Sequence, residues 1–255
     1  MSKQKFDDLA TDYDASRPRY PDELFTALST ALPAGRRLRV LDAGAGTGIA
    51  LEGLVAHLGE QHDYVAVDLS SGMAAIGRAK LGHVDWRVEP VEPALTRYHG
   101  ELDLVLAAQA YQWFDRPRFV AAAHTALRSG GILAVLQNNR DHASSPFVAA
   151  YEDLLERLSP GYSRSYRAFD VAAELAGPFG AADADVSTHV ATWHQTCTVD
   201  EFVRLASSST QVQRGVTAHG ARMLDEVRAL AAAAAHDGDV EMAYRSELYF
   251  ARRSR

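Results

Sequence analysis

Short apolar runs recur along the first half of the chain, separated by stretches in which apolar residues follow helical spacing. Runs of four to seven nearly continuous apolar residues predict strands that are buried on both faces. Helices between such strands predict an α/β fold with a doubly wound, mostly parallel sheet. The predicted strands lie at 38–41, 64–69, 84–88, 102–108 and 132–136.

Helix boundaries are marked by residues that favour helix ends. Pro21, Asp22 and Glu23 predict the start of a helix, because proline fits its first turn and acidic residues favour its positive end. Ser70 and Ser71 predict the cap of another helix. A further helix is expected over 119–127.

The pattern changes after residue 137. Strands expected at 191–198 and 241–252 raise the total to seven, and the fold class predicted is therefore a Rossmann-like, seven-stranded sheet with helices on both faces and a small helical cap. Thr198 and Glu201 predict a capping box. The remaining expectations are a polar loop at 138–145, a helix at 147–158, a loop or short helices at 161–169, and a helix at 219–235.

A glycine-rich turn follows the first strand. Asp42 ends the strand, and Gly44, Gly46 and Gly48 lead into a helix that begins near Ile49. Strand, glycine turn and helix let a nucleotide-like ligand approach bare backbone. The dinucleotide fingerprint would need glycine at position 49, and no lysine follows as in a phosphate loop. A tight turn in some other α/β protein is the alternative.

Composition narrows the class of protein. The 255 residues are 47% hydrophobic and 23% charged, as in a globular protein with a sizeable core. The net charge of -7 argues against nucleic acid as a partner. The single cysteine, Cys197, excludes an internal disulfide and a multi-thiolate metal site, and we expect no metal. Without a signal peptide or a membrane-spanning run, we expect a cytoplasmic protein with no membrane contact.

Polar residues follow the ends of the predicted strands, where open α/β sheets bind ligands. Asp68 could accept both hydroxyls of a ribose, or it could belong to the helix cap at Ser70. Met73 could lie along an adenine ring, or in the helix core. Other such ends are at Asp42–Gly48, Glu89–Glu92, Ala107–Gln109 and Gln137–Arg140.

Five segments together resemble the class I S-adenosylmethionine (SAM) dependent methyltransferases, in the group that includes trans-aconitate methyltransferase. The resemblance spans roughly residues 6 to 136, with its motifs in the right order. It is specific for the class and not for a substrate. The segments are FDDLATDYDASRPRYP at 6–21, VLDAGAGTG at 40–48, VAVDLSSGM at 65–73, DLVLAAQAYQWFDRPRF at 103–119 and LRSGGILAV at 127–135.

The resemblance implies roles for individual residues. It implies that the three glycines adjoin the methionine part of SAM, that Asp68 holds the ribose, and that Arg17 binds the methionine carboxylate. It also implies that Gln109 and Trp113 lie beside the sulfonium and the acceptor. The expected cofactor-binding residues are Arg17, Asp42, Gly44, Gly46, Gly48, Asp68, Leu69, Met73, Val91, Glu92 and Gln109.

One segment departs from the pattern of the family. Relatives often carry G-D/T-A-E after the third strand, beside the adenine amino group. Here these positions are Glu89, Pro90, Val91 and Glu92, and proline has no N–H to donate. Adenine recognition is therefore expected from the Val91 amide or from Glu92, although Glu92 could equally be a solvated loop acid.

The chemistry expected is an in-line methyl transfer that leaves S-adenosylhomocysteine (SAH). Positioning of the reactants can supply about 7 to 11 kcal/mol. A carboxylate acceptor needs no base, whereas a hydroxyl would, and the candidate bases are His142, His194 and His219. The positioning candidates are Gln109, Trp113 and His142, and the aromatic neighbours considered for the sulfonium are Tyr13, Tyr20, Tyr111, Trp113 and Phe114.

The stretch after the fifth strand is a candidate acceptor site. Tyr162, Arg164, Tyr166 and Arg167 could bind an anionic acceptor, or they could form a charged loop that faces solvent. The function predicted is methylation of a small molecule at oxygen, by a monomer or homodimer. The alternatives are a catalytically idle SAM-binding module and a methyltransferase that acts on a macromolecule.

The chain contains no internal repeat and no long linker, and we expect a single methyltransferase domain over residues 1–255. Its parts would be an N-terminal helical segment at 1–35, a SAM-binding core at 36–140, a helical cap at 141–190 and a C-terminal part of the fold at 191–255.

Overall fold

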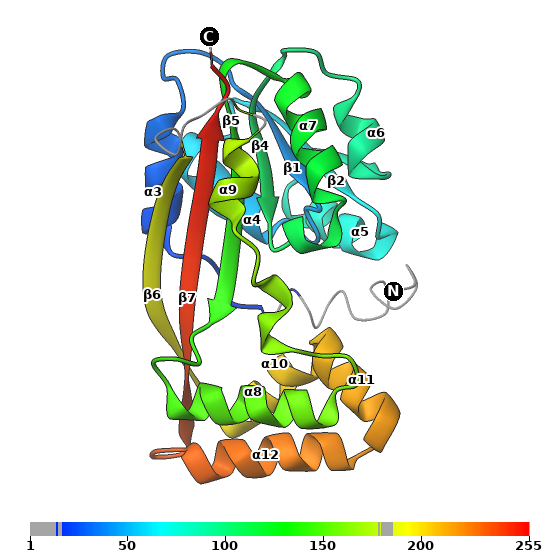
Figure 1. The fold of residues 1–255 in the computed structure, drawn as a ribbon, viewed down its shortest axis with the longest axis vertical. Helices are drawn as coiled ribbons and strands as arrows, with labels where there is room; N and C mark the ends of the chain where they lie inside the picture. The colour runs from blue at the N-terminus through cyan, green and yellow to red at the C-terminus, as the bar shows by residue number, and fades with distance from the viewer. Residues whose placement is uncertain (1–13, 15–16, 178, 180–185, 255) are drawn as a thin grey trace.

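A seven-stranded sheet forms the upper part of the molecule in Figure 1, which shows a computed structural model that describes residues 14, 17–177, 179 and 186–254. The strand order is β3-β2-β1-β4-β5-β7-β6. The first five strands pair in parallel, and β7 pairs antiparallel with both β5 and β6. The strands are β1 (Arg39–Ala43), β2 (Asp63–Asp68), β3 (Asp85–Val88), β4 (Leu102–Ala108), β5 (Leu127–Arg140), β6 (Val186–Thr198) and β7 (Asp239–Arg252).

Helices cover both faces of the sheet, because neighbouring residues of each central strand point to opposite faces and both faces are apolar. Val40 packs in one buried cluster and Leu41 in the other. The first cluster includes residues of α3 (Asp22–Ala31), α4 (Ile49–Leu58) and α5 (Ser71–Lys80). The second includes residues of α6 (Val91–Leu95), α7 (Arg116–Ala126) and α9 (Val171–Ala176).

A separate layer of helices lies beyond the carboxyl ends of the parallel strands (Figure 1). It comprises α8 (Pro146–Leu158), α10 (Val199–Ser207), α11 (Thr210–His219) and α12 (Arg222–Ala234). These helices form a third buried cluster with the first residues of β7, from Val240 to Tyr244. The long antiparallel strands β6 and β7 thus connect the sheet to the helical layer. No helix in the described ranges has the length and apolar character needed to cross a membrane.

The predicted seven-stranded, mostly parallel fold is confirmed. The cap of α5 at Ser70 and the capping box of α10 at Thr198 and Glu201 are confirmed as well. The division of the chain into one domain with four parts stays a prediction. Residues 6–13, 15 and 16 of the N-terminal motif lie outside the described residues.

One expectation about the second half was wrong. The loop expected at 138–145 begins later, because β5 continues to Arg140 by pairing with β7, Arg140 lying opposite Tyr244. The helix expected at 219–235 is present as α12, which begins later, at Arg222, because His219 ends α11 and Gly220 has a φ of 62°. The short helices α6, α9 and η1 (Tyr111–Trp113), as well as α11, were missed. The 3-10 helix η2 (Arg164–Arg167) lies where short helices were expected.

Candidate active site

The glycine turn after β1 is held against the neighbouring strand β2. The backbone N–H groups of Gly44 and Ala45 both donate to the Val67 carbonyl, at 2.8 and 3.0 Å. All three glycines have positive φ, which favours glycine. A Cβ on Gly44 would lie 2.5 Å from that of Ala110, whereas a Cβ on Gly46 would meet open space. Gly46 therefore presents bare backbone to a ligand, and Gly44 allows two loops to approach closely.

Asp68 joins the loops that follow β1 and β2. Its Oδ2 accepts the N–H of Gly46 at 2.8 Å, and its Oδ1 accepts the N–H of Ser70 at 2.8 Å. Ser70, not Asp68, caps α5, because the Ser70 hydroxyl accepts the Met73 N–H at 3.1 Å. Each carboxylate oxygen can accept more than one hydrogen bond. Asp68 can thus fix the glycine turn and still accept further donors.

Asp42 is a buried acid at the carboxyl end of β1. It is 1% exposed, and neither of its side-chain oxygens has a hydrogen-bond partner among the described residues. Burial, and secondarily the negative charge of Asp68, raises the pKa of Asp42 to about 8. A buried polar group without a partner is costly and is satisfied when a ligand supplies a donor. Asp42 therefore fits an ammonium group, which can both donate hydrogen bonds and neutralise the carboxylate.

A cavity of about 550 Å³ lies between the ends of the parallel strands and the helical layer. Asp42, Gly44 and Gly46 line it from the sheet. Tyr151 and Arg167 line it from α8 and η2. Its volume is within the range of cavities that bind small molecules and cofactors. Both the glycine turn and the helical layer thus face one ligand-sized space.

Comparison with known proteins identifies the class. Residues 40–131 match a family described as a methyltransferase domain. An uncharacterised methyltransferase of Schizosaccharomyces pombe is 27% identical over 203 residues, 80% of this chain and 77% of that protein. A protein of Anaeromyxobacter dehalogenans, provisionally assigned as a type II methyltransferase, has a similar fold, with a TM-score of 0.67 at 24% identity over 93% of this chain and 98% of that one. The segment at 40–131 is a methyltransferase domain, and the chain as a whole has the fold of the Anaeromyxobacter protein.

The expected methyl donor for this domain is S-adenosylmethionine, as the sequence motifs imply. A trans-aconitate 2-methyltransferase of Deinococcus radiodurans is 30% identical over 140 residues. That alignment covers 54% of this chain and about half, 52%, of the Deinococcus enzyme. These relationships establish the reaction class and leave the acceptor open.

The methyltransferase cavity brings together six of the expected cofactor-binding residues. Met73 is buried beneath it, and Gln109 lies at its edge between β4 and β5. Two expected positioning residues, Trp113 and His142, also line it, Trp113 with 56% of its surface exposed. The six cofactor candidates are Arg17, Asp42, Gly44, Gly46, Met73 and Gln109.

Five expected residues do not line the cavity. A Cβ on Gly48 would lie 3.1 Å from the Trp86 ring, which indicates a packing role at the start of α4. The Val91 side chain is buried in the core as the first residue of α6. The others are Asp68, Leu69 and Glu92, of which Leu69 is 60% exposed.

Gln109 has an unusual backbone and a buried side chain. It is one of two non-glycine residues with positive φ in the described part, at 54°. Its N–H donates to the Leu136 carbonyl at 2.8 Å, and its Nε2 donates to the Asn138 carbonyl at 2.5 Å. Its Oε1 is buried and has no partner among the described side chains and backbone. Strained backbone of this kind is concentrated at functional sites.

Only one of the three candidate bases reaches the cavity. His142 is exposed at its rim, whereas His194 lies on the edge strand β6 and His219 ends α11. Tyr20 lines the cavity, but Tyr111 lies in the core, where its hydroxyl donates to Glu174 at 2.8 Å. Phe114 does not line the cavity either, and it packs on Phe119 against the same core, with ring centroids 4.7 Å apart. Tyr13 lies outside the described residues.

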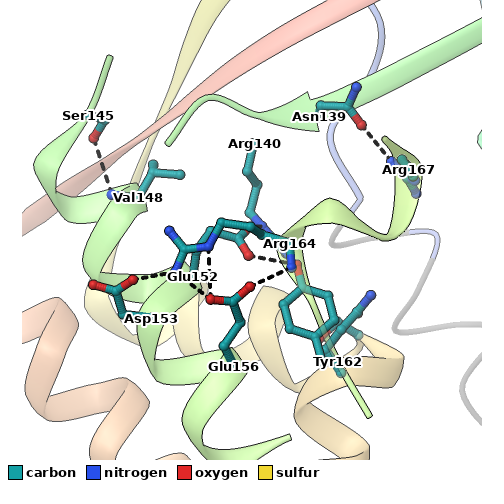
Figure 2. Close-up of polar contacts among 12 residues, drawn as sticks. Asn139, Arg140, Ser145, Val148, Glu152, Asp153, Glu156, Tyr162, Arg164 and Arg167 are labelled. Atoms are coloured by element: carbon teal, nitrogen blue, oxygen red, sulfur yellow. Dashed lines mark hydrogen bonds and ion pairs between the residues drawn. The ribbon is translucent and has the colours of Figure 1, made fainter. Parts of the chain in front are cut away.

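The sequence did not reveal a buried ionic cluster at the helical side of the cavity (Figure 2). Arg140, at the end of β5, donates from Nε to Glu152 at 2.5 Å and from Nη2 to the Tyr162 hydroxyl at 3.0 Å. Tyr162 donates to the other oxygen of Glu152 at 2.6 Å. Burial lowers the pKa of Arg140, but the charge of Glu152 more than compensates and holds that pKa above its usual value. The signal in the sequence was an acid on the apolar face of a helix, since Glu152 follows Val148 and Tyr151.

Proposed function

We propose that this protein transfers the methyl group of S-adenosylmethionine to an oxygen atom of a small molecule. The observation that carries this proposal is the single cavity in which Asp42 and Gly46 face the ionic cluster of the helical layer. Its volume of about 550 Å³ suits the methionine end of the cofactor together with a small acceptor.

The residues present fit the cofactor at its charged end. Asp42 offers two buried oxygens that lack partners in the described part of the chain, and these suit the ammonium of the methionine moiety. Gly46 leaves room for close approach, and Asp68 offers its remaining lone pairs to the ribose hydroxyls. When bound, the cofactor supplies an electrophilic methyl group on a cationic sulfur. The protein holds the acceptor oxygen in line with it at near-attack distance.

A carboxylate acceptor is supported best by the residues around the cavity. Such an acceptor is already ionised at neutral pH and needs no base. His142 is exposed at the rim, where it could serve a hydroxyl acceptor only if the reacting group lay beside it. The name of the Deinococcus relative refers to trans-aconitate, which is a carboxylic acid. Gln109, which has a strained backbone and lines the cavity, is the candidate that positions the acceptor.

The test is a screen of purified protein with SAM against panels of carboxylic acids, phenols and amines, read by mass spectrometry. The expected product is an acid that has gained the mass of one methylene unit, with release of SAH. Methylation restricted to amines would refute transfer to oxygen. Binding of SAH without turnover of any acceptor would instead favour an idle binding module, and methylation of protein or RNA alone would refute a small-molecule acceptor.

The first prediction concerns Asp68. Asp68→Ala removes the acceptor of the Gly46 N–H and the proposed ribose contact, and SAH binding should weaken tenfold or more, about 1.4 kcal/mol. Isothermal titration calorimetry measures the change. Asp63→Ala, at the opposite end of β2, is the matched control, because the one ion pair of Asp63 within the described residues is with Arg37 at the surface. Equal affinity in the two variants would remove Asp68 from the cofactor site.

A further inference from the structure

Three arginines on the helical side of the cavity differ in how their charge is balanced. Arg140 forms an ion pair with the buried carboxylate of Glu152. Arg164, on η2, also lines the cavity, and it pairs with two carboxylates of α8, Asp153 and Glu156. Arg167, three residues further along η2, forms no ion pair with any carboxylate in the described part of the chain.

Arg167 is nevertheless held in place. Its Nη1 donates to Asn139 Oδ1 at 2.8 Å, at the end of β5, and its guanidinium lies 4.8 Å from the centre of the Tyr166 ring. Figure 2 shows Arg167 and Asn139 set apart from the carboxylates of α8. The Nε of Arg167 is buried and has no hydrogen-bond partner within the described ranges. A fixed guanidinium with a free donor is prepared to bind an anion, since its fork matches an oxyanion.

The surroundings of Arg167 also favour binding of a negatively charged group. Burial, together with the positive charges of Arg140 and Arg17, lowers the pKa of Arg167, although the nearby tyrosines Tyr166 and Tyr20 oppose this. Concentrating positive charge in a partly buried site costs free energy unless a counter-ion is present. Glu152 already pairs with Arg140, and no carboxylate of the described residues pairs with Arg167, so we look to a ligand for its counter-ion.

We propose that Arg167 binds an oxyanion of the methyl acceptor, a carboxylate or phosphate group that is not itself methylated, and so selects acidic acceptors. This inference rests on the proposed function and adds the substrate class. The anion bound must be a spectator, because a guanidinium bound to the attacking oxygen would withdraw electron density from it. Arg167 also lies on η2 and contacts the end of β5, outside the glycine turn that faces the charged end of the cofactor.

The same carboxylate chemistry occurs in the methionine part of SAM, and the first experiment distinguishes the two sources. Calorimetry of SAH binding compares the wild type with Arg167→Gln and Arg164→Gln. Arg164→Gln is the matched control, since it removes the same charge from the same 3-10 helix, where Asp153 and Glu156 balance it. We expect Arg167→Gln to bind SAH within about twofold of the wild type. A loss of tenfold or more would assign Arg167 to the cofactor and overturn the proposal.

The second experiment measures anion binding without turnover, so that it stays informative if the proposed methyl transfer fails. Succinate and inorganic phosphate are added at millimolar concentration to the SAH-saturated protein, with neutral succinamide as the control ligand. We expect at least one of the two anions, and not succinamide, to raise the melting temperature of the wild type and of Arg164→Gln. Arg167→Gln should lose this increase and Arg167→Lys should recover part of it. An increase that is absent in the wild type, or unchanged in Arg167→Gln, would overturn the proposal.

If the acceptor screen yields an acid, a third measurement separates binding from chemistry. Arg167→Gln should raise KM for that acid tenfold or more with a smaller change in kcat, because a spectator contact binds ground state and transition state alike. Unchanged KM would contradict the assignment.

Discussion

Asp42 is the residue that we propose binds the ammonium group of the methyl donor. It is buried, and its two oxygens lack hydrogen-bond partners among the residues described. Such a carboxyl is tolerated in the ligand-free protein only because it keeps its proton, as its pKa of about 8 indicates. Binding of a ligand ammonium would favour the ionised form instead.

The pKa of Asp42 predicts how stability depends on pH. In the unfolded chain an aspartate has a pKa near 3.9, so between about pH 4 and pH 8 the unfolded state releases a proton that the folded state keeps. The protonated Asp42 therefore contributes to the free energy of unfolding below pH 4, and this contribution is lost as the pH rises to 8. Asp42→Asn removes it, and the free energy of unfolding should then fall less steeply, by up to about 1.4 kcal/mol per pH unit.

Urea unfolding of the ligand-free protein at several pH values between 4 and 8 measures this slope. Asp63→Asn, exposed on the same sheet, is the control and should follow the wild type. Parallel curves for Asp42→Asn and the wild type would show that Asp42 is ionised in the folded state.

At the residue scale the sequence was informative where one local motif specifies the contact. Gly44, Gly46 and Ser70 could be predicted because positive φ and a helix cap depend on a few neighbouring residues. The contact of Arg140 with Glu152 could not, because it joins two elements whose relative position only the packed fold determines. The roles of Val91 and Glu92 at adenine stay predictions.

The glycine turn is the element that we propose holds the cofactor against the sheet, and Gly44 and Gly46 have different neighbours. Gly44 makes room for Ala110, whereas Gly46 makes room for whatever enters the cavity. Substitution by alanine should therefore separate stability from binding.

Gly44→Ala should destabilise the protein more than Gly46→Ala. Both replacements impose left-handed backbone on alanine, about 1–2 kcal/mol, but only the first adds a clash, with Ala110, worth about 1–3 kcal/mol more. Gly46→Ala should weaken SAH binding more than the loss of folding stability alone would explain. The reason is that the added methyl group projects into open space at the cavity. Urea unfolding and calorimetry on both variants give the two rankings, and the reverse order of stability would contradict the packing argument.

The elements that sequence periodicity predicted are those with a buried stripe of their own. The central strands and α8 have one, and their bounds were close. The extension of β5 through Asn138 to Arg140 was missed because polar residues carry no hydrophobic signal there, and the pairing with β7 decides the conformation. The start of α12 was predicted too early, at His219, because only Gly220 marks the turn between α11 and α12.

On the scale of the whole molecule, the cavity divides two differently built layers. The sheet side consists of loops that follow parallel strands, and the opposite side consists of helices with a core of their own. A ligand that bridges the layers stabilises both, because it binds only when they are correctly placed.

Saturation with SAH should accordingly raise the melting temperature. At a concentration of 100 times Kd the stabilisation is about 2.7 kcal/mol, which corresponds to about 5–10 °C for a chain of this length. Differential scanning calorimetry measures the shift. Asp68→Ala at the same SAH concentration should show a smaller one, and no shift in the wild type would contradict binding of the cofactor product.

The extension of β5 and β7 beyond the last residue of β4 has a consequence for how such an enzyme diversifies. The helices between 146 and 158 and between 199 and 234 pack on the extended part of β7. They lie far along the chain from the glycine turn that follows β1. Exchange of those helices between homologous proteins could retarget the enzyme to new acceptors while its use of the methyl donor is inherited unchanged.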